Sequence, residues 1–134
     1  LLSLPLAFAS HFILDKIPHW NPHLYRESKK FGKPAKTSTI IVILDSFSAL
    51  FLGFFIASRQ LPNLNRAAIV VLACLAAVLP DLIEAPYFFL NIKNNKILEK
   101  WINFHRGLQK HIPFFTGIVP QIIVLAAALY WALS

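Results

Sequence analysis

The sequence predicts an all-α membrane protein, a multi-pass transmembrane helical bundle of about four spans plus a short interfacial helix. Two observations lead to this fold class. Of the 134 residues, 57% are hydrophobic and only 14% are charged, which is too apolar for an ordinary soluble domain. The apolar residues also gather into runs, several of them near the roughly 20 residues needed to cross a bilayer core. We therefore expect a single membrane-embedded domain over residues 1–134.

The apolar runs lie in four places along the chain. The first, residues 1–14, is short, and no Met or basic segment precedes it, so we expect it to be the end of a longer spanning helix whose start lies upstream. The other runs are long enough to span the bilayer alone, and they cover residues 40–58, 67–92 and 112–133. Because Pro80 and Pro86 lie inside the third run, a kink or break is expected there.

The connections between the runs are polar. Residues 18–39 contain three prolines and a glycine, which interrupt helical continuity, so we expect an irregular connection there. Residues 94–111 differ, because their apolar side chains fall largely at helical spacing around Trp101. This pattern predicts a short amphipathic helix in the membrane interface, with the Trp101 indole at headgroup level.

The positive charge is distributed unevenly over the connections. Eleven of the 13 basic residues lie in the first and third connections, and only Arg59 and Arg66 lie in the second. Because successive spans alternate in direction, the first and third connections share one side, which the positive-inside rule predicts to be cytoplasmic. We expect the basic residues on that side to lie near anionic lipid headgroups. The basic run at residues 26–36 has one aromatic residue and does not indicate nucleic-acid binding.

A dense group of titratable residues follows the first apolar run. The stretch SHFILDKIPHWNPH, residues 10–23, holds three of the five histidines. His11 and Asp15 are four positions apart, so on a helix they lie on one face, one turn apart, as two ligands of one metal would. Pro18 is expected to end the helix and to let His19 fold back toward the same face.

Further acidic residues and a histidine are expected on the same side of the membrane. Asp45 lies near the start of the second run, Asp81 and Glu84 share one face of the third, and His105 follows in the interfacial segment. An unpaired carboxylate inside the membrane costs about 2.5–3.5 kcal/mol, so these groups are expected to face the bundle interior. Mixed nitrogen and oxygen ligands suit Zn²⁺, with Mn²⁺ and Fe²⁺ as alternatives.

Each of these residues also has a purely structural interpretation. His11 and Asp15 can form a simple hydrogen-bonded pair at a helix end, and His19 can serve as an interfacial anchor. Asp81 can cap a half-helix created by the proline break. Asp45 can pair with a lysine whose long side chain reaches along the helix. The metal hypothesis depends on the convergence of these residues rather than on any one of them.

Three stretches of the sequence, SHFILDKIPHW, LPDLIEAPYF and FHRGLQKH, resemble the signature motifs of a known family. The family comprises bacterial and archaeal membrane-bound proteins predicted to be metal-dependent hydrolases, distantly similar to zinc-dependent phospholipase C. The resemblance covers most of the chain and implies as metal ligands His11, Asp15, Asp81 and His105. The chain departs from the family at two positions. Ile83 stands where a further Asp is usual, and His111 follows His105 by six residues instead of five.

The residues and the resemblance together predict a membrane-embedded hydrolase of a phosphoester. The substrates considered include lipid-derived phosphoesters. A metal-bound water would be the nucleophile, with Glu84 or Asp45 as general base and Arg106 as a phosphate ligand. His105 beside Arg106 can alternatively bind lipid phosphate only. The alternative function is a non-enzymatic membrane protein, either an ion or metal conductor or a structural subunit. The outer halves of the long runs carry no charged side chain, which favours a site at one face over a path through the membrane.

Overall fold

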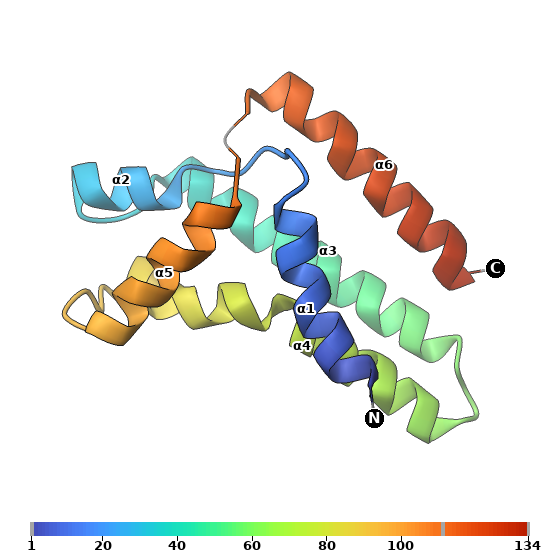
Figure 1. Ribbon diagram of the computed structural model, residues 1–134. Coiled ribbons are helices and arrows are strands. Elements are labelled where there is room, and N and C mark those ends of the chain that lie inside the picture. Colours follow the sequence, from blue (N-terminus) through green and yellow to red (C-terminus); the bar gives the residue numbers. More distant parts are fainter. Residues whose placement is uncertain (1, 111, 134) are drawn as a thin grey trace.

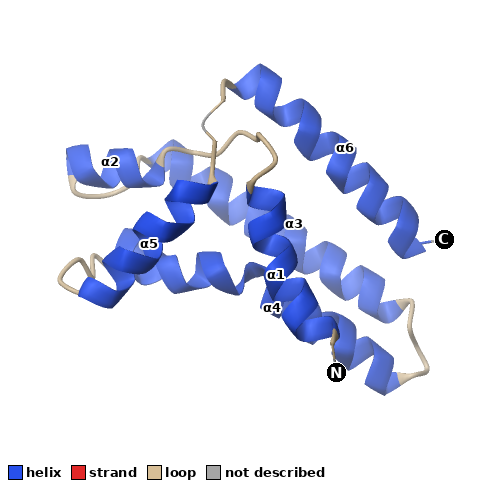
Figure 2. Cartoon of the chain, viewed as in Figure 1, coloured by secondary structure: helices blue, strands red, loops and turns tan. Residues whose placement is uncertain are grey.

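The computed structural model describes residues 2–110 and 112–133, and these residues form six helices and no strand (Figures 1 and 2). The all-α prediction is therefore confirmed. In chain order the helices are α1 (Ser3–Asp15), α2 (Leu24–Phe31), α3 (Lys36–Ser58), α4 (Leu64–Phe89), α5 (Lys96–Leu108) and α6 (Phe114–Leu133).

Three of the helices, α3, α4 and α6, are long and apolar enough to cross a membrane. They correspond to the three long runs of the sequence, with ends shifted by a few residues. Helix α1, which occupies the first and shorter run, is not among these candidate spans because it has only 13 residues. At about 1.5 Å of rise per residue, α1 covers roughly 20 Å, short of the roughly 30 Å thickness of a hydrocarbon core.

The central element of the fold is α4, which contacts α1, α2, α3 and α5. It forms an antiparallel hairpin with α3, and α1 packs along it on another side (Figure 1). Helix α4 passes through both of its prolines without interruption, so the expected break is absent; the helix bends instead (Figure 1). The indole Nε1 of Trp101 in α5 donates a hydrogen bond to the carbonyl of Pro80 at 3.2 Å and so joins α5 to this bend.

Helix α6 stands apart from the other helices in Figure 1 and meets the α1–α2 loop at Trp20. The Gln121 side-chain amide donates a hydrogen bond to the Trp20 carbonyl at 3.0 Å. At Gly117 the two backbones approach so closely that an added Cβ would lie 2.5 Å from the Trp20 nitrogen. Only glycine fits at this contact without displacing the loop.

Helix α2 was not expected from the sequence, which suggested an irregular connection. Pro22 lies just before it, and Gly32 ends it in the left-handed conformation with φ of 80°. Glu27 then joins α2 to the start of α3, where its carboxylate accepts hydrogen bonds from the Ala35 nitrogen at 2.9 Å and the Ser38 hydroxyl at 2.8 Å. A glutamate from the neighbouring helix therefore satisfies one backbone donor and one hydroxyl at the start of α3.

The buried apolar core is small and lies where α2 and α5, which carry many of the basic residues, meet the end of α4. It consists of Tyr87 and Phe88 of α4 with Leu98 and Ile102 of α5. Over most of their length the long helices instead expose apolar side chains, as expected for surfaces that face lipid. The core therefore fixes α5 against the second half of α4, where the candidate site lies.

Candidate metal centre

The first part of the candidate site is the C-terminal turn of α1. The Nε2 atom of His11 lies 3.5 Å from Oδ2 of Asp15, across one turn of the helix. Asp15 is buried although it is the last residue of α1, because α1 packs against α4 and α5 there. The expected pairing of these two residues on one helix face is present.

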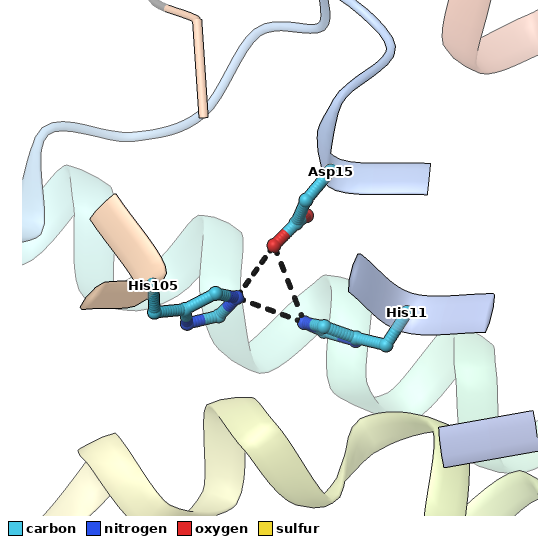
Figure 3. A group of neighbouring side chains, drawn as sticks. All are labelled: His11, Asp15 and His105. Carbon is cyan, nitrogen blue, oxygen red and sulfur yellow. Dashed lines mark hydrogen bonds and ion pairs between the residues drawn. The ribbon is translucent and has the colours of Figure 1, made fainter. Parts of the chain in front are cut away.

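His105 of α5 enters this pair from the other side (Figure 3). Its Nε2 atom lies 2.5 Å from Oδ2 of Asp15 and 3.1 Å from Nε2 of His11. The side chain is 1% exposed, so water does not compete for these contacts. The three potential ligand atoms all lie within 4.8 Å of one another, and the buried group could hold a metal ion.

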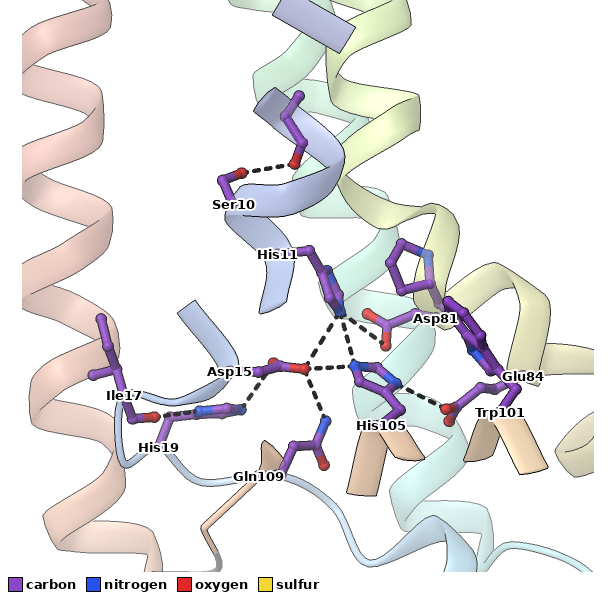
Figure 4. A network of polar contacts seen from close by, with 12 residues as sticks. Ser10, His11, Asp15, Ile17, His19, Asp81, Glu84, Trp101, His105 and Gln109 are labelled. Atoms are coloured by element: carbon purple, nitrogen blue, oxygen red, sulfur yellow. Dashed lines mark hydrogen bonds and ion pairs between the residues drawn. The ribbon is translucent and has the colours of Figure 1, made fainter. Parts of the chain in front are cut away.

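Glu84 of α4 lies behind His105 on the ring edge that faces away from His11 (Figure 4). Its Oε1 accepts a hydrogen bond from Nδ1 of His105 at 2.8 Å, and both residues are buried. A carboxylate in this position fixes the ring orientation and makes the opposite nitrogen a better metal ligand. The sequence placed Glu84 near the site, but nothing in it indicated this contact with a residue 21 positions later.

The two carboxylates also decide the charge of His105. Burial by itself lowers its pKa, but the hydrogen bonds and charges of Asp15 and Glu84 outweigh burial and raise the pKa to about 10. In the metal-free arrangement His105 is therefore an imidazolium at neutral pH, with one proton directed to each carboxylate. Its positive charge stands where a metal cation would compensate the same carboxylates.

The spacing of the three atoms can be compared with a tetrahedral metal site. Ligand bonds of ~2.0–2.1 Å place neighbouring ligand atoms about 3.3 Å apart. The distances from His11 to His105, 3.1 Å, and from His11 to Asp15, 3.5 Å, are close to this value. Only the 2.5 Å distance between His105 and Asp15 is shorter, because a hydrogen bond occupies that edge. Replacing its proton by a metal requires these two side chains to separate by less than about 1 Å, so the residues fit a zinc ion.

Two more predicted ligands lie next to this group without belonging to it (Figure 4). Oδ1 of Asp81 is 3.7 Å from Nε2 of His11, and the Asp81 side chain is 63% exposed. Nε2 of His19 is 3.9 Å from Oδ1 of Asp15, the oxygen not shared by the three ligands. Nδ1 of His19 donates a hydrogen bond to the Ile17 carbonyl at 2.7 Å, which orients the ring so that Nε2 faces Asp15.

An aromatic wall closes one side of the candidate site. The Phe12 ring centroid lies 5.9 Å from that of His105 and 6.0 Å from those of Trp101 and Phe104. These rings exclude water from one side of the histidine pair, which strengthens electrostatic interactions inside. On another side Gln109 reaches Oδ2 of Asp15 at 3.4 Å. Neither Phe12 nor Gln109 was expected from the sequence to belong to the site, since neither residue type is a usual metal ligand.

The remaining predicted site residues are placed differently. Asp45 is exposed in the middle of α3 and has no hydrogen bond or ion pair with any described residue. The Arg106 guanidinium carbon lies 3.6 Å from the centroid of the Tyr25 ring, on which the group stacks. His23 lies at the start of α2. His111, whose role the sequence left open, is outside the described residues.

Comparisons with known proteins add no family assignment. No protein-family model, curated protein or solved structure matches this chain. Three apolar helices that can cross a membrane, together with a buried His11, Asp15 and His105 group that could hold a metal ion, are the features on which its function must be argued.

Proposed function

We propose that this protein is a membrane-embedded, metal-dependent hydrolase of a phosphoester, with a divalent metal, zinc in the first instance, held by His11, Asp15 and His105. The observation that carries the proposal is the convergence of three ligand atoms within 4.8 Å from helices far apart in sequence. The Glu84 carboxylate behind His105 supports it, because such outer partners are typical of metal-binding histidines. The motif resemblance to membrane-bound metal-dependent hydrolases favours hydrolysis as the reaction.

The chain's own groups have separate roles in this proposal. A bound zinc ion supplies a Lewis acid and lowers the pKa of its water to about 7. Asp81, whose Oδ1 lies 3.7 Å from Nε2 of His11 at the exposed edge of the site, would be the fourth ligand. Glu84 is engaged with His105, so we assign it positioning of the ring instead of the general-base role that the sequence suggested. Asp45 would have to act from another conformation.

The substrate class follows from the charge around the site. Eleven of the 13 basic residues lie in the two connections that flank it, so an anionic substrate is attracted there. Arg106, next to His105 in α5, supplies a guanidinium that binds phosphate oxygens in a bidentate fashion when it leaves the Tyr25 ring. The positive-inside rule places this face in the cytoplasm, and we propose the prokaryotic cytoplasmic membrane as its location.

Metal content is the first test of this function. Elemental mass spectrometry on detergent-purified protein is expected to find about one metal ion per chain, and Asp15→Ala and His105→Ala are expected to lose it. Asp45→Asn is the matched control, a carboxylate removed outside the group. Zinc-loaded protein should then hydrolyse phosphodiester or phosphomonoester probes. Metal binding without hydrolysis would favour a non-enzymatic metal protein, and a metal-free wild type after reconstitution would overturn the proposal.

A further inference from the structure

We propose that the outward side of α5, together with α2, binds an anionic lipid leaflet. In this arrangement Ile97, Trp101 and Phe104 enter the boundary of the acyl chains, while Lys96 and Lys100 meet lipid phosphates. The proposed surface does not include the buried ligands His11, Asp15 and His105, although half-buried Trp101 and exposed Phe104 also contact Phe12 beside them. The inference does not depend on the metal or on any activity.

Helix α5 has two distinct apolar sides. Leu98, Ile102 and His105 are buried against the rest of the protein. Ile97 and Phe104 are 81% and 56% exposed, and with Trp101 they form a second stripe, since steps of four and three residues stay on one helix face. Globular helices usually bury their single apolar stripe, so a second exposed stripe indicates a further apolar environment.

The position of α5 between two candidate spans indicates which apolar environment its exposed stripe meets. Helix α5 begins seven residues after α4 ends and ends six residues before α6 begins, and both neighbours are candidate spans. At no more than about 3.5 Å per residue, such connections keep α5 close to the level where the spans leave the bilayer. A helix held there with an exposed apolar stripe lies with that stripe in the lipid boundary.

Charge selects an anionic leaflet over a neutral one. Exposed basic side chains on α2, α5 and the loop after α2 include Arg26, Lys29, Lys30, Lys33, Lys96 and Lys100. Of the two acidic residues on these helices, Glu27 is bonded to the start of α3, which leaves Glu99 exposed. Each lysine near an anionic surface contributes about 1 kcal/mol, which is roughly a fivefold preference.

The two helices form one continuous surface. Arg106 of α5 stacks on Tyr25 of α2, and the Lys93 ammonium group, just before α5, donates a hydrogen bond to the Gly32 carbonyl just after α2. These contacts tie both ends of α2 to the α5 region. Phe31, exposed at the end of α2, adds an apolar side chain to the same basic surface.

Fluorescence quenching by brominated lipids tests this surface in nanodiscs of phosphatidylcholine and phosphatidylglycerol. The variant Trp20→Phe, Trp131→Phe leaves Trp101 as the only indole, and bromine is carried by one lipid or the other at equal mole fraction. We expect brominated phosphatidylglycerol to quench Trp101 at least about twice as strongly as brominated phosphatidylcholine. The double change Lys96→Gln, Lys100→Gln should weaken this difference without unfolding the protein, because both lysines are exposed.

Trp131 provides the matched control. It is 85% exposed near the far end of α6, away from the basic surface. In the variant Trp20→Phe, Trp101→Phe, where Trp131 is the only indole, both brominated lipids should quench its fluorescence equally. Absence of Trp101 quenching by either lipid would show that α5 is not in the leaflet. Equal quenching of Trp101 by both lipids, or a preference that the lysine changes leave unaltered, would overturn the assignment to an anionic surface at α5.

Discussion

The junction of α1, α4 and α5 and the middle of α3 each contain an aspartate that the sequence placed in an apolar helix, yet their surroundings are opposite. Asp15 is buried and contacts three histidines and a glutamine. Asp45 is exposed, as is every residue from 43 to 51, and it has no polar partner among the described residues. Helix α3 buries residues only toward its two ends, where Ser38 bonds Glu27 of α2 and Gly53 faces Cys74 of α4. A carboxylate therefore gains partners where three helices meet, and not merely because it belongs to an apolar helix.

Of the changes in these two regions, Asp15→Asn is expected to lower zinc affinity the most. The amide keeps the shape of the side chain but removes the charge that compensates a divalent metal. We expect zinc affinity to fall by more than the ~10–100-fold typical of an outer-partner change. Competition with a zinc-sensitive dye would measure this loss. If zinc affinity stayed unchanged, Asp15 would not be a metal ligand and would not differ from Asp45 in this respect.

A smaller effect is expected for Glu84→Gln. The glutamine carbonyl can still accept the Nδ1 hydrogen of His105, but its lack of charge makes Nε2 a poorer ligand. Zinc affinity should fall about tenfold, the lower end of the range for such partners. The same dye competition measures the change, and Glu99→Gln, an exposed carboxylate on α5, serves as control. An equal loss in both variants would point to general electrostatic attraction instead of positioning.

The dependence of zinc affinity on pH tests whether zinc displaces a proton from His105 at the junction. Because the pKa of His105 is raised to about 10, zinc must displace its Nε2 proton at every pH below that value. A falling pH favours the proton and a rising pH favours the metal, so affinity should increase about tenfold per pH unit between about pH 7 and 9. Isothermal titration in two buffers of different protonation enthalpy would count the released protons. Zinc binding without proton release would contradict the imidazolium assignment.

The smallest effect is expected for Asp45→Asn. Asp45 shares no contact with the group, and substitutions at independent sites usually do not interact, so zinc affinity should change by less than about twofold. Dye competition on this variant, measured beside Asp15→Asn, completes the comparison. A large loss of zinc affinity in Asp45→Asn would mean that α3 turns toward the junction in the membrane. Asp45 would then belong to the metal site together with Asp15.

The sequence predicted the elements that depend on local pattern. Long apolar runs predicted α3, α4 and α6, and the four-residue spacing of His11 and Asp15 predicted their common face. Helix α2 escaped prediction because its Pro22 and Gly32 lie at its two ends, where they bound a helix instead of breaking one.

The tertiary part of the site was less accessible to sequence reasoning. The expected convergence of His105 on the α1 pair is present, but its hydrogen bond to Glu84 depends on how α5 rotates against α4. That rotation is set by the burial of Leu98 and Ile102, and the sequence could not distinguish their stripe from the adjacent one of Ile97 and Phe104. For the same reason the exposure of Asp45 could not be foreseen, since the sequence does not say which neighbour covers α3.

The contact between Asp15 and His105 also closes a loop in the chain. The two residues are 90 positions apart, and the intervening chain contains α2, α3 and α4. The entropy lost on closing a loop grows only slowly with its length, so a single strong contact is enough to hold such distant segments together. During synthesis α1 is made first, and α5 follows only after α3 and α4 have been made. Occupancy of the junction thus reports that α5 has joined α1, while α1 is held independently by its packing along α4.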